Sequence, residues 1–168
     1  AERFRDEGYS GNITIDSIGS GAGFERFCVA GETDISNASR AIKDSEIESC
    51  RAIGREPIEF RIGTDALAVV VHPANPISKL TREQLEEIFT GKITNWKQVG
   101  GSDMKIIVYS RETSSGTYEF FKEHVLNKKN FAPSALLLAA TGAVVQSVSQ
   151  TKGAIGYIGV AYIDKQVK

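Results

Sequence analysis

The chain has 168 residues, of which 41% are hydrophobic and 24% are charged, values typical of a globular protein that can bury its own core. Lys and Arg number 20 and Asp and Glu 21, so the net charge is -1, which argues against a general nucleic-acid binder or a polybasic membrane binder. No apolar stretch approaches the roughly 20 residues of a membrane-spanning helix, so the sequence excludes an integral membrane protein built that way.

Strand-like and helix-like patterns alternate along the first third of the chain. Residues 12–18 alternate apolar and polar side chains and predict a half-buried strand, whereas residues 24–28 place apolar side chains at helical spacing. Residues 33–38 predict a second short strand, and a second helix opens at Asp44. Residues 58–62 alternate again and predict a third strand.

The remaining elements continue the alternation. Residues 66–71 are a continuous apolar run, which predicts a fully buried parallel strand. Thr81 and Gln84 have the spacing of a capping box, so a helix begins there, and Gly91 ends it. The further predicted elements are a strand at 105–109, a helix opening at Ser115, a helix at 142–150 and a strand at 153–160. This order predicts an α/β fold with mainly parallel sheets.

Three turns, each between a predicted strand and a predicted helix, share small and hydroxyl-bearing residues. They are Gly19-Ser20-Gly21-Ala22-Gly23, Asn37-Ala38-Ser39-Arg40 and Thr113-Ser114-Ser115-Gly116-Thr117. A helix N-terminus has unpaired N–H groups and a partial positive charge, so each turn could bind an anion. The alternative is that these residues only cap helices, as Ser and Thr commonly do. Three such turns in one short chain favour the anion site.

Arg111 strengthens the anion hypothesis, because it ends a predicted strand four residues before Ser115. A guanidinium grips an oxyanion with two parallel hydrogen bonds. The alternative is a surface arginine paired with Glu112. Neither nucleotide-loop pattern, G-x-x-x-x-G-K-[ST] or G-x-G-x-x-G, occurs, so a small tetrahedral anion fits better than a nucleotide.

Catalysis, metal binding and cofactor binding have little support in the sequence. The histidines, His72 and His124, are in positions that favour structural or solvated roles, and no common catalytic motif occurs. An enzyme that uses Ser20 or Ser115 as a nucleophile remains an alternative. We expect no enzyme activity, no cofactor and no metal, the cysteines being too few for a paired-Cys zinc site.

The two cysteines allow two interpretations. Cys28 lies near the end of one predicted helix and Cys50 near the middle of the next, so they are either two buried thiols or one disulfide of an exported protein. The chain starts at Ala1 with neither Met nor an apolar leader, and we expect any signal peptide to have been removed.

Five stretches together resemble a known family. They are GSGAGFERFCVAGETDISNASRAI, DALAVVVHPANP, LTREQLEEIFTGKITNWKQVGG, SRETSSGTYEFF and GAIGYIGVAY. In this order they are similar to the phosphate-binding protein of the phosphate ABC transporter, a periplasmic or lipid-anchored receptor with the type II periplasmic-binding-protein fold. The similarity covers nearly the whole chain. It implies a solute-binding protein that captures inorganic phosphate for uptake and works with the membrane subunits of an ABC transporter.

The resemblance also implies a division into lobes. Residues 1–63 would be part of lobe 1, 64–72 a hinge strand, 73–153 lobe 2, and 154–168 the returning hinge strand with the start of the return to lobe 1. The first lobe would be incomplete, and its open sheet edges would favour self-association. In the subfamily that this chain resembles most, the two cysteines form a disulfide.

The resemblance places site residues of the family on Ser20 and on Arg111, Ser115, Gly116 and Thr117, which the anion argument also selects. The expected site consists of Ser20, Gly21, Ser39, Arg40, Asp65, Arg111, Ser115, Gly116 and Thr117. Many family members have an aspartate, which accepts the proton of monohydrogen phosphate, where this chain has Arg40. We therefore expect Asp65 to replace that acceptor and to pair with Arg40. The departure leaves two alternatives open: a receptor for another oxyanion such as sulfate, molybdate or a phosphonate, and a sensory or adhesive module of the same fold.

Overall fold

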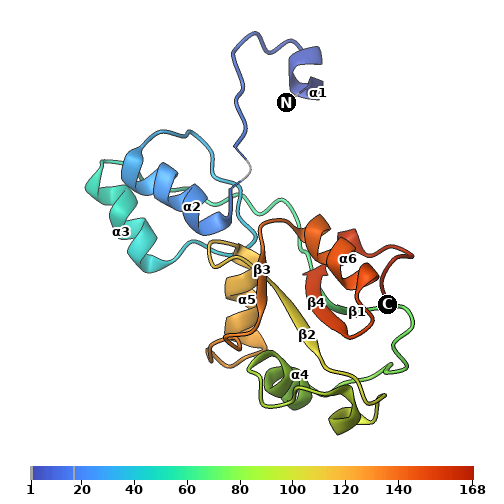
Figure 1. The fold of residues 1–168 in the computed structure, drawn as a ribbon. Helices are drawn as coiled ribbons and strands as arrows, with labels where there is room; N and C mark the ends of the chain where they lie inside the picture. The colour runs from blue at the N-terminus through green and yellow to red at the C-terminus, as the bar shows by residue number, and fades with distance from the viewer. Residues whose placement is uncertain (1, 17) are drawn as a thin grey trace.

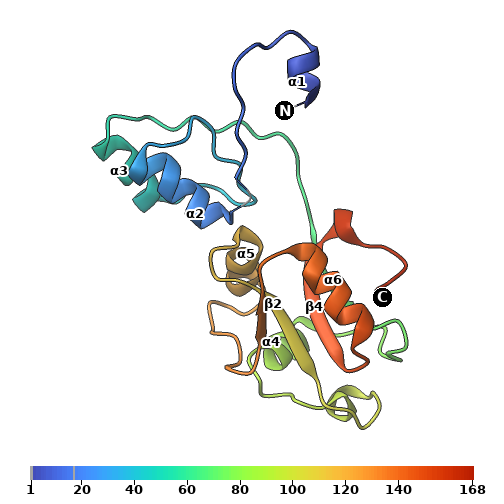
Figure 2. The same cartoon turned by 45° about the horizontal axis from the view of Figure 1, so that its top comes forward.

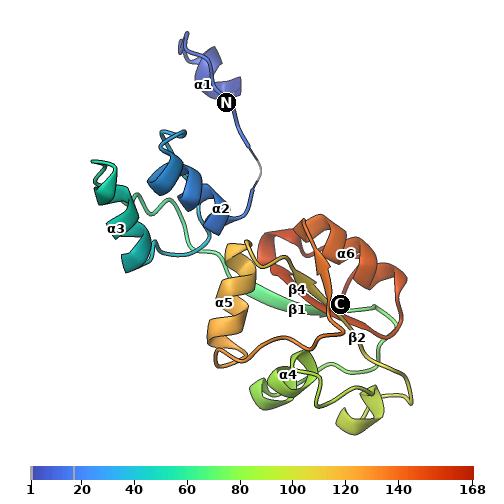
Figure 3. The same ribbon diagram turned by 60° about the vertical axis from the view of Figure 1, so that its left-hand side comes forward.

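The computed structural model describes residues 2–16 and 18–168, which form two regions (Figure 1). We call residues 2–16 and 18–63 the N-terminal part and residues 67–168 the sheet body. The N-terminal part contains the helices α1 (Glu2–Asp6), α2 (Ser20–Glu25) and α3 (Asp44–Ala52), with a π-helical turn η1 (Arg26–Ala30) after α2. Figures 1 and 3 show α2 and α3 side by side, and α1 apart from both.

A four-stranded sheet forms the centre of the sheet body. Its strands are β1 (Leu67–Val71), β2 (Ile107–Arg111), β3 (Leu136–Leu138) and β4 (Ala154–Gly159), in the order β1-β4-β2-β3. β2 runs parallel to both β3 and β4, as the sequence predicts. The prediction that residues 66–71 form a parallel strand is wrong, because β1 lies at the sheet edge and pairs antiparallel with β4, with Leu67 opposite Gly159.

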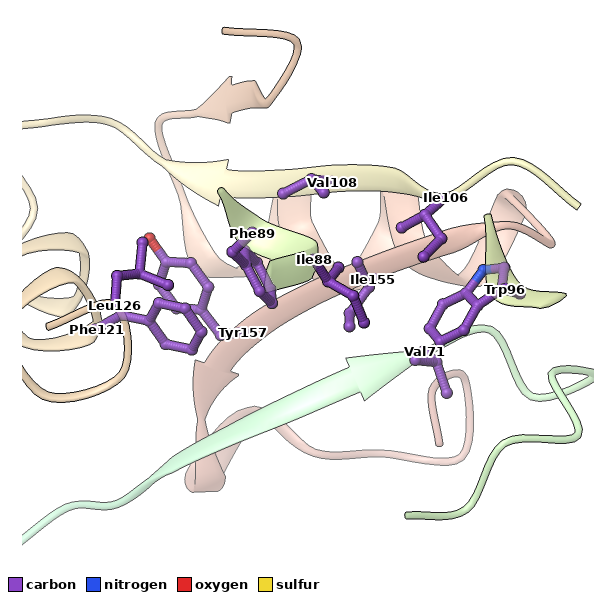
Figure 4. Close-up of a cluster of buried hydrophobic side chains, with 10 residues drawn as sticks. All are labelled: Val71, Ile88, Phe89, Trp96, Ile106, Val108, Phe121, Leu126, Ile155 and Tyr157. Atoms are coloured by element: carbon purple, nitrogen blue, oxygen red, sulfur yellow. The ribbon is translucent and has the colours of Figure 1, made fainter. Parts of the chain in front are cut away.

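Helices cover both faces of this sheet. The helices are α4 (Arg82–Phe89), α5 (Gly116–His124) and α6 (Thr141–Gln150), with 3-10 turns at Trp96–Val99 and Val160–Tyr162. Figure 2 shows α6 in front of the sheet and α4 behind it. Strand side chains alternate between the faces, so Val70 packs with the valines of α6 whereas Val71 belongs to the cluster that includes Ile88 and Phe89 of α4 (Figure 4).

Local sequence signals place the helices of the sheet body correctly. Thr81 accepts a hydrogen bond from the N–H of Gln84 at 3.2 Å, and the Gln84 side chain accepts one from the N–H of Thr81 at 2.9 Å. This is the predicted capping box. Gly91 has a φ of 84°, which favours glycine, just after α4 ends. The helix expected at 142–150 begins one residue earlier, at Thr141.

The predicted strands of the N-terminal part do not form. Residues 12–16, 18, 33–38 and 58–62 have no strand structure, and Ser17, which also belongs to the first prediction, lies outside the described residues. An extended segment becomes a strand only when its N–H and C=O groups pair with a neighbour. No such ladder involves these described residues, and the side chains meant for a core, such as Ile35 and Phe60, are about 80% exposed.

A disulfide joins Cys28 and Cys50. It connects the π-helical turn to α3, and both cysteines are fully buried between these elements. The pairing that the resemblance implies is therefore confirmed, and the interpretation as two free thiols is wrong.

Candidate anion-binding site

One pocket of about 300 Å³ lies where the N-terminal part meets the sheet body. All three turns predicted from the sequence contribute to its wall, together with the end of β2. The lining residues are Ile18, Gly19, Ser20, Asn37, Ala38, Ser39, Arg111, Ser115, Gly116 and Thr117. The fold thus brings residues 18–20 and 37–39 together with residues 111–117, which lie far from them in the chain.

The N-terminus of α5 forms one wall of the pocket. Ser115 is the N-cap, and its Oγ accepts a hydrogen bond from the N–H of Tyr118 at 3.4 Å. A Cβ atom at Gly116 would lie within 2.5 Å of Ser20 Oγ, so only glycine allows the serines of the N-terminal part to approach this helix. The first N–H groups of α5 and its partial positive charge consequently face a wall of hydroxyl groups.

Two serines form the opposite wall. The N–H of Ser39 donates to Ser20 Oγ at 3.2 Å, and the two hydroxyl oxygens are 3.3 Å apart. This contact attaches the 37–40 turn to the beginning of α2. Ser20 is only 7% exposed, so its hydroxyl points into the structure at the pocket and not into bulk solvent.

Arg111 provides the positive charge of the pocket. Its guanidinium donates to the carbonyl oxygens of Leu138 at 3.3 Å and Ala139 at 2.8 Å, and to Thr141 Oγ1 at 2.8 Å. These acceptors, at the end of β3 and the start of α6, fix the side chain at the pocket edge. Arg111 is the one charged residue among the lining residues that the structure describes, so the pocket is electrostatically suited to an anion.

A buried tyrosine fixes the backbone of Arg111. The Tyr157 hydroxyl accepts from the N–H of Arg111 at 3.2 Å and shares a hydrogen bond of 2.8 Å with Ser110 Oγ. Burial, only partly offset by the hydrogen bond with Ser110, raises the pKa of Tyr157 to about 12. The hydroxyl is therefore neutral at physiological pH and acts as a fixed support for the end of β2.

Three of the expected site residues do not line the pocket. The N–H of Gly21 donates to the carbonyl of Ser114 at 3.2 Å, so it is already engaged. The expected pair of Arg40 and Asp65 does not form: Arg40 pairs with Glu46 and Glu119, which are closer to it. Asp65 is exposed, and its carboxylate accepts from the N–H of Ala66 at 2.8 Å.

Two residues that support the site were missed at the level of sequence. Thr141 binds Arg111 from the start of a helix that was predicted, so its hydroxyl at a helix N-terminus was a signal that could have been used. Tyr157 lies in the buried strand 153–160, where a hydroxyl needs a partner. The partner of this hydroxyl, Ser110 on β2, could not be predicted without knowing that β2 pairs with β4.

Other chemical features are sparse. Among the described residues there is no group of three or more His, Cys, Asp or Glu side chains that could hold a metal ion. Neither histidine lies in the pocket: His72 Nδ1 accepts from the N–H of Ala74, and His124 packs beside the ring of Phe120. None of the helices in the described part of the chain is long and apolar enough to cross a bilayer.

Comparison with known proteins defines the class of this protein. Residues 1–168 match the family model of the PBP superfamily domain, and the chain therefore belongs to the PBP superfamily. Its mixed α/β structure with a four-stranded sheet matches the type II periplasmic-binding-protein fold.

Individual relatives are similar over nearly the whole of this chain. The chain is 41% identical to protein SphX of Synechococcus elongatus and 38% identical to the phosphate-binding protein PstS of Staphylococcus epidermidis. Each match covers 98% of this chain and 50% of the relative, so the chain spans about half the length of these proteins. A Clostridium perfringens structure described as a phosphate ABC transporter substrate-binding protein with bound phosphate is 35% identical, with a TM-score of 0.88 over 100% of this chain and 67% of that one.

Proposed function

We propose that the pocket binds inorganic phosphate and that the protein is a solute-binding protein that captures phosphate for uptake by an ABC transporter. One observation carries the proposal: three turns rich in Ser and Gly converge with Arg111 on a single pocket. Relatives with 35% and 38% identity are named as phosphate-binding or phosphate-transport proteins, which supports phosphate as the ligand.

The chemistry of the pocket matches a tetrahedral oxyanion. Arg111 supplies a charged donor, and the N-terminus of α5 supplies N–H groups from Gly116 and Thr117. The hydroxyls of Ser20 and Ser39 can donate from the opposite side. Several donors around one anion replace the water that the anion loses on entering the pocket.

A role in transport also requires a hinge, a membrane partner and a location outside the cytoplasm. In this proposal β1 and β4, which run antiparallel, are the hinge strands between the lobes, and bending there opens the pocket. The partners are the membrane subunits of the transporter. The disulfide between Cys28 and Cys50 supports a location outside the cytoplasm, where disulfides persist, either periplasmic or attached to the membrane by a lipid.

A second anion class is favoured by one observation. The lining residues that the structure describes include no carboxylate, so only neutral oxygens, such as the Asn37 amide and the serine hydroxyls, can accept the proton of monohydrogen phosphate. Neutral acceptors discriminate less strongly than a carboxylate against a fully ionised oxyanion such as sulfate or molybdate. The choice between phosphate and these anions is therefore a matter for titration.

Calorimetric titration with phosphate, sulfate, molybdate and a phosphonate tests the proposal. We expect phosphate to bind with the highest affinity. If none of the four anions binds, the proposed function is wrong. Tighter binding of sulfate would favour the second class. The same preparation should release no phosphate from a model ester above background, because no base lies within hydrogen-bond distance of Ser20 or Ser115 in the described structure.

A further inference from the structure

A charged cluster crosses from the N-terminal part to the sheet body beside the pocket. Arg40 follows the pocket residue Ser39, and its Nη1 and Nη2 donate to the two carboxylate oxygens of Glu46 at 2.8 and 2.6 Å. The guanidinium lies 4.9 Å from the ring centre of Phe24, and the side chain is only 9% exposed. A bidentate pair and a stacked ring hold Arg40 in one orientation.

That orientation directs the remaining donor of Arg40 across the interface. Nε of Arg40 donates to Oε2 of Glu119, which is in the first turn of α5. The other oxygen of Glu119 accepts from Nζ of Lys43 at 2.5 Å. Figure 3 shows that α5 is the helix of the sheet body that lies nearest α2 and α3. Glu119 thus receives two cations from the N-terminal part.

Both ends of this contact are attached to the pocket. Arg40 is next to Ser39 on one wall, and Glu119 is three residues after Gly116 on the other. We propose that the ion pair of Arg40 and Glu119 is a latch that holds the two walls together and slows the release of a bound anion. This inference rests on the proposed function for the identity of the anion. Arg40 is therefore a positioning residue and not a ligand.

Arg40 and Glu46, which holds it in place, are charged at neutral pH. The hydrogen bond to Glu46 raises the pKa of Arg40. Burial acts to raise the pKa of Glu46, but the hydrogen bonds from Arg40 and from the N–H of Lys43 outweigh it, so the net change is a lowered pKa. The partly buried position of Arg40 also protects the contact from screening by salt, in contrast to an exposed pair.

The substitution Glu119→Gln separates a latch from a local charge effect. A carboxylate near the N-terminus of α5 repels an anion in the pocket, so its removal would strengthen phosphate binding if charge alone mattered. If the latch operates, the same change weakens phosphate binding about tenfold, within the range of coupling between contacting charged groups. The weaker binding should appear as a faster dissociation rate of phosphate, because the open state then forms more often.

A matched control is available on the exposed surface. Glu56→Gln removes one carboxylate from the Arg51–Glu56 pair, whose side chains are 60% and 64% exposed and lie outside the pocket. Stopped-flow measurement of phosphate release should give a faster rate for Glu119→Gln and an unchanged rate for Glu56→Gln. An unchanged or slower release from Glu119→Gln would overturn the latch.

A second readout needs no ligand. Spin labels on Glu48→Cys in α3 and Gln146→Cys in α6, both exposed positions, report the separation of the two regions without phosphate. We expect Glu119→Gln to shift the label distances to longer values, and identical distributions would contradict the latch. If the parent protein does not bind phosphate, the proposed function fails, while these distances still decide whether the latch exists.

Discussion

The N-terminal part and the sheet body are stabilised in different ways. In the sheet body, two apolar clusters fill the space between the sheet and its helices, and residues such as Ile88, Phe89 and Val144 are fully buried. In the N-terminal part, a disulfide and polar contacts replace such a core. Arg55, for example, donates to the carbonyl oxygens of Phe27, Gly31 and Thr33.

This difference explains how the proposed anion site is built. Arg111 and the start of α5 are attached to the well-packed sheet body, so half of the site is preorganised by a core. Ser20 and Ser39 belong to a region that depends on crosslinks and on contacts with the sheet body. The site therefore has one wall fixed by packing and one wall positioned by specific polar contacts.

The largest effect is expected in the core of the sheet body. Phe89 is fully buried, and its ring centre lies 4.7 Å from that of Phe121 and 5.8 Å from that of Tyr157. Phe89→Ala should lower the free energy of unfolding by about 3–5 kcal/mol, because it leaves a cavity among aromatic rings. Phe120, on α5, is 43% exposed, so Phe120→Ala is the matched control and should cost far less in the same urea titration. Equal losses would mean that the apolar cluster does not dominate the stability of this region.

The disulfide should matter most for the N-terminal part. It closes a loop across a sequence separation of 22 residues, so its removal in the variant Cys28→Ser/Cys50→Ser should cost about 3 kcal/mol. Hydrogen exchange should increase in α2 and α3 and stay unchanged in β2 and β4. The unreduced, unfolded parent should have no titratable thiol, and finding two would refute the crosslink.

The hydroxyl of Tyr157 connects core packing to the site. Tyr157→Phe leaves the N–H of Arg111 and Ser110 without their partner and should cost about 1–3 kcal/mol. In the parent, an unfolded tyrosine ionises near pH 10 whereas the folded pKa is raised to about 12. The stability linked to this group is therefore present below pH 10 and lost as the pH rises to 12. The difference in the free energy of unfolding between the parent and Tyr157→Phe, measured as a function of pH, should show this loss. The same pH dependence in both proteins would contradict it.

The smallest effect is expected for the exposed segment 58–62. Phe60 is 80% exposed in the structure, so Phe60→Ser should change the free energy of unfolding by less than about 0.5 kcal/mol. Chemical denaturation of the parent and the variant measures the difference. A loss comparable to that of Phe89→Ala would mean that Phe60 is buried in solution and that the comparison of the two regions is wrong.

The elements predicted correctly are those with a local cause. Thr81 and Gln84 lie within one helical turn of each other, so their capping box could be recognised from the sequence. The strand at 58–62 was predicted from equally clear alternation, yet a strand also needs a neighbour, and the alternation of one segment contains no information about its partner.

The same limit applies to the site. Ser20, Ser115 and Arg111, which line the pocket, could be selected from the sequence because each stands at a turn before a helix, a feature of a few consecutive residues. Arg40 was assigned to Asp65, whereas it pairs with Glu46, six residues away, and with Glu119, 79 residues away. Glu119 is brought near only by the packing of α5 against the N-terminal part. Side-chain partners between distant segments depend on the folded structure.

The central claim is that the pocket between the two regions binds phosphate through Arg111. Calorimetric titration of Arg111→Ala with inorganic phosphate, beside the exposed control Arg51→Ala, tests it most directly. We expect Arg111→Ala to weaken binding by about 2–5 kcal/mol, because the anion loses its charged partner, and Arg51→Ala to bind as the parent does. A phosphate affinity of Arg111→Ala equal to that of the parent would contradict the account.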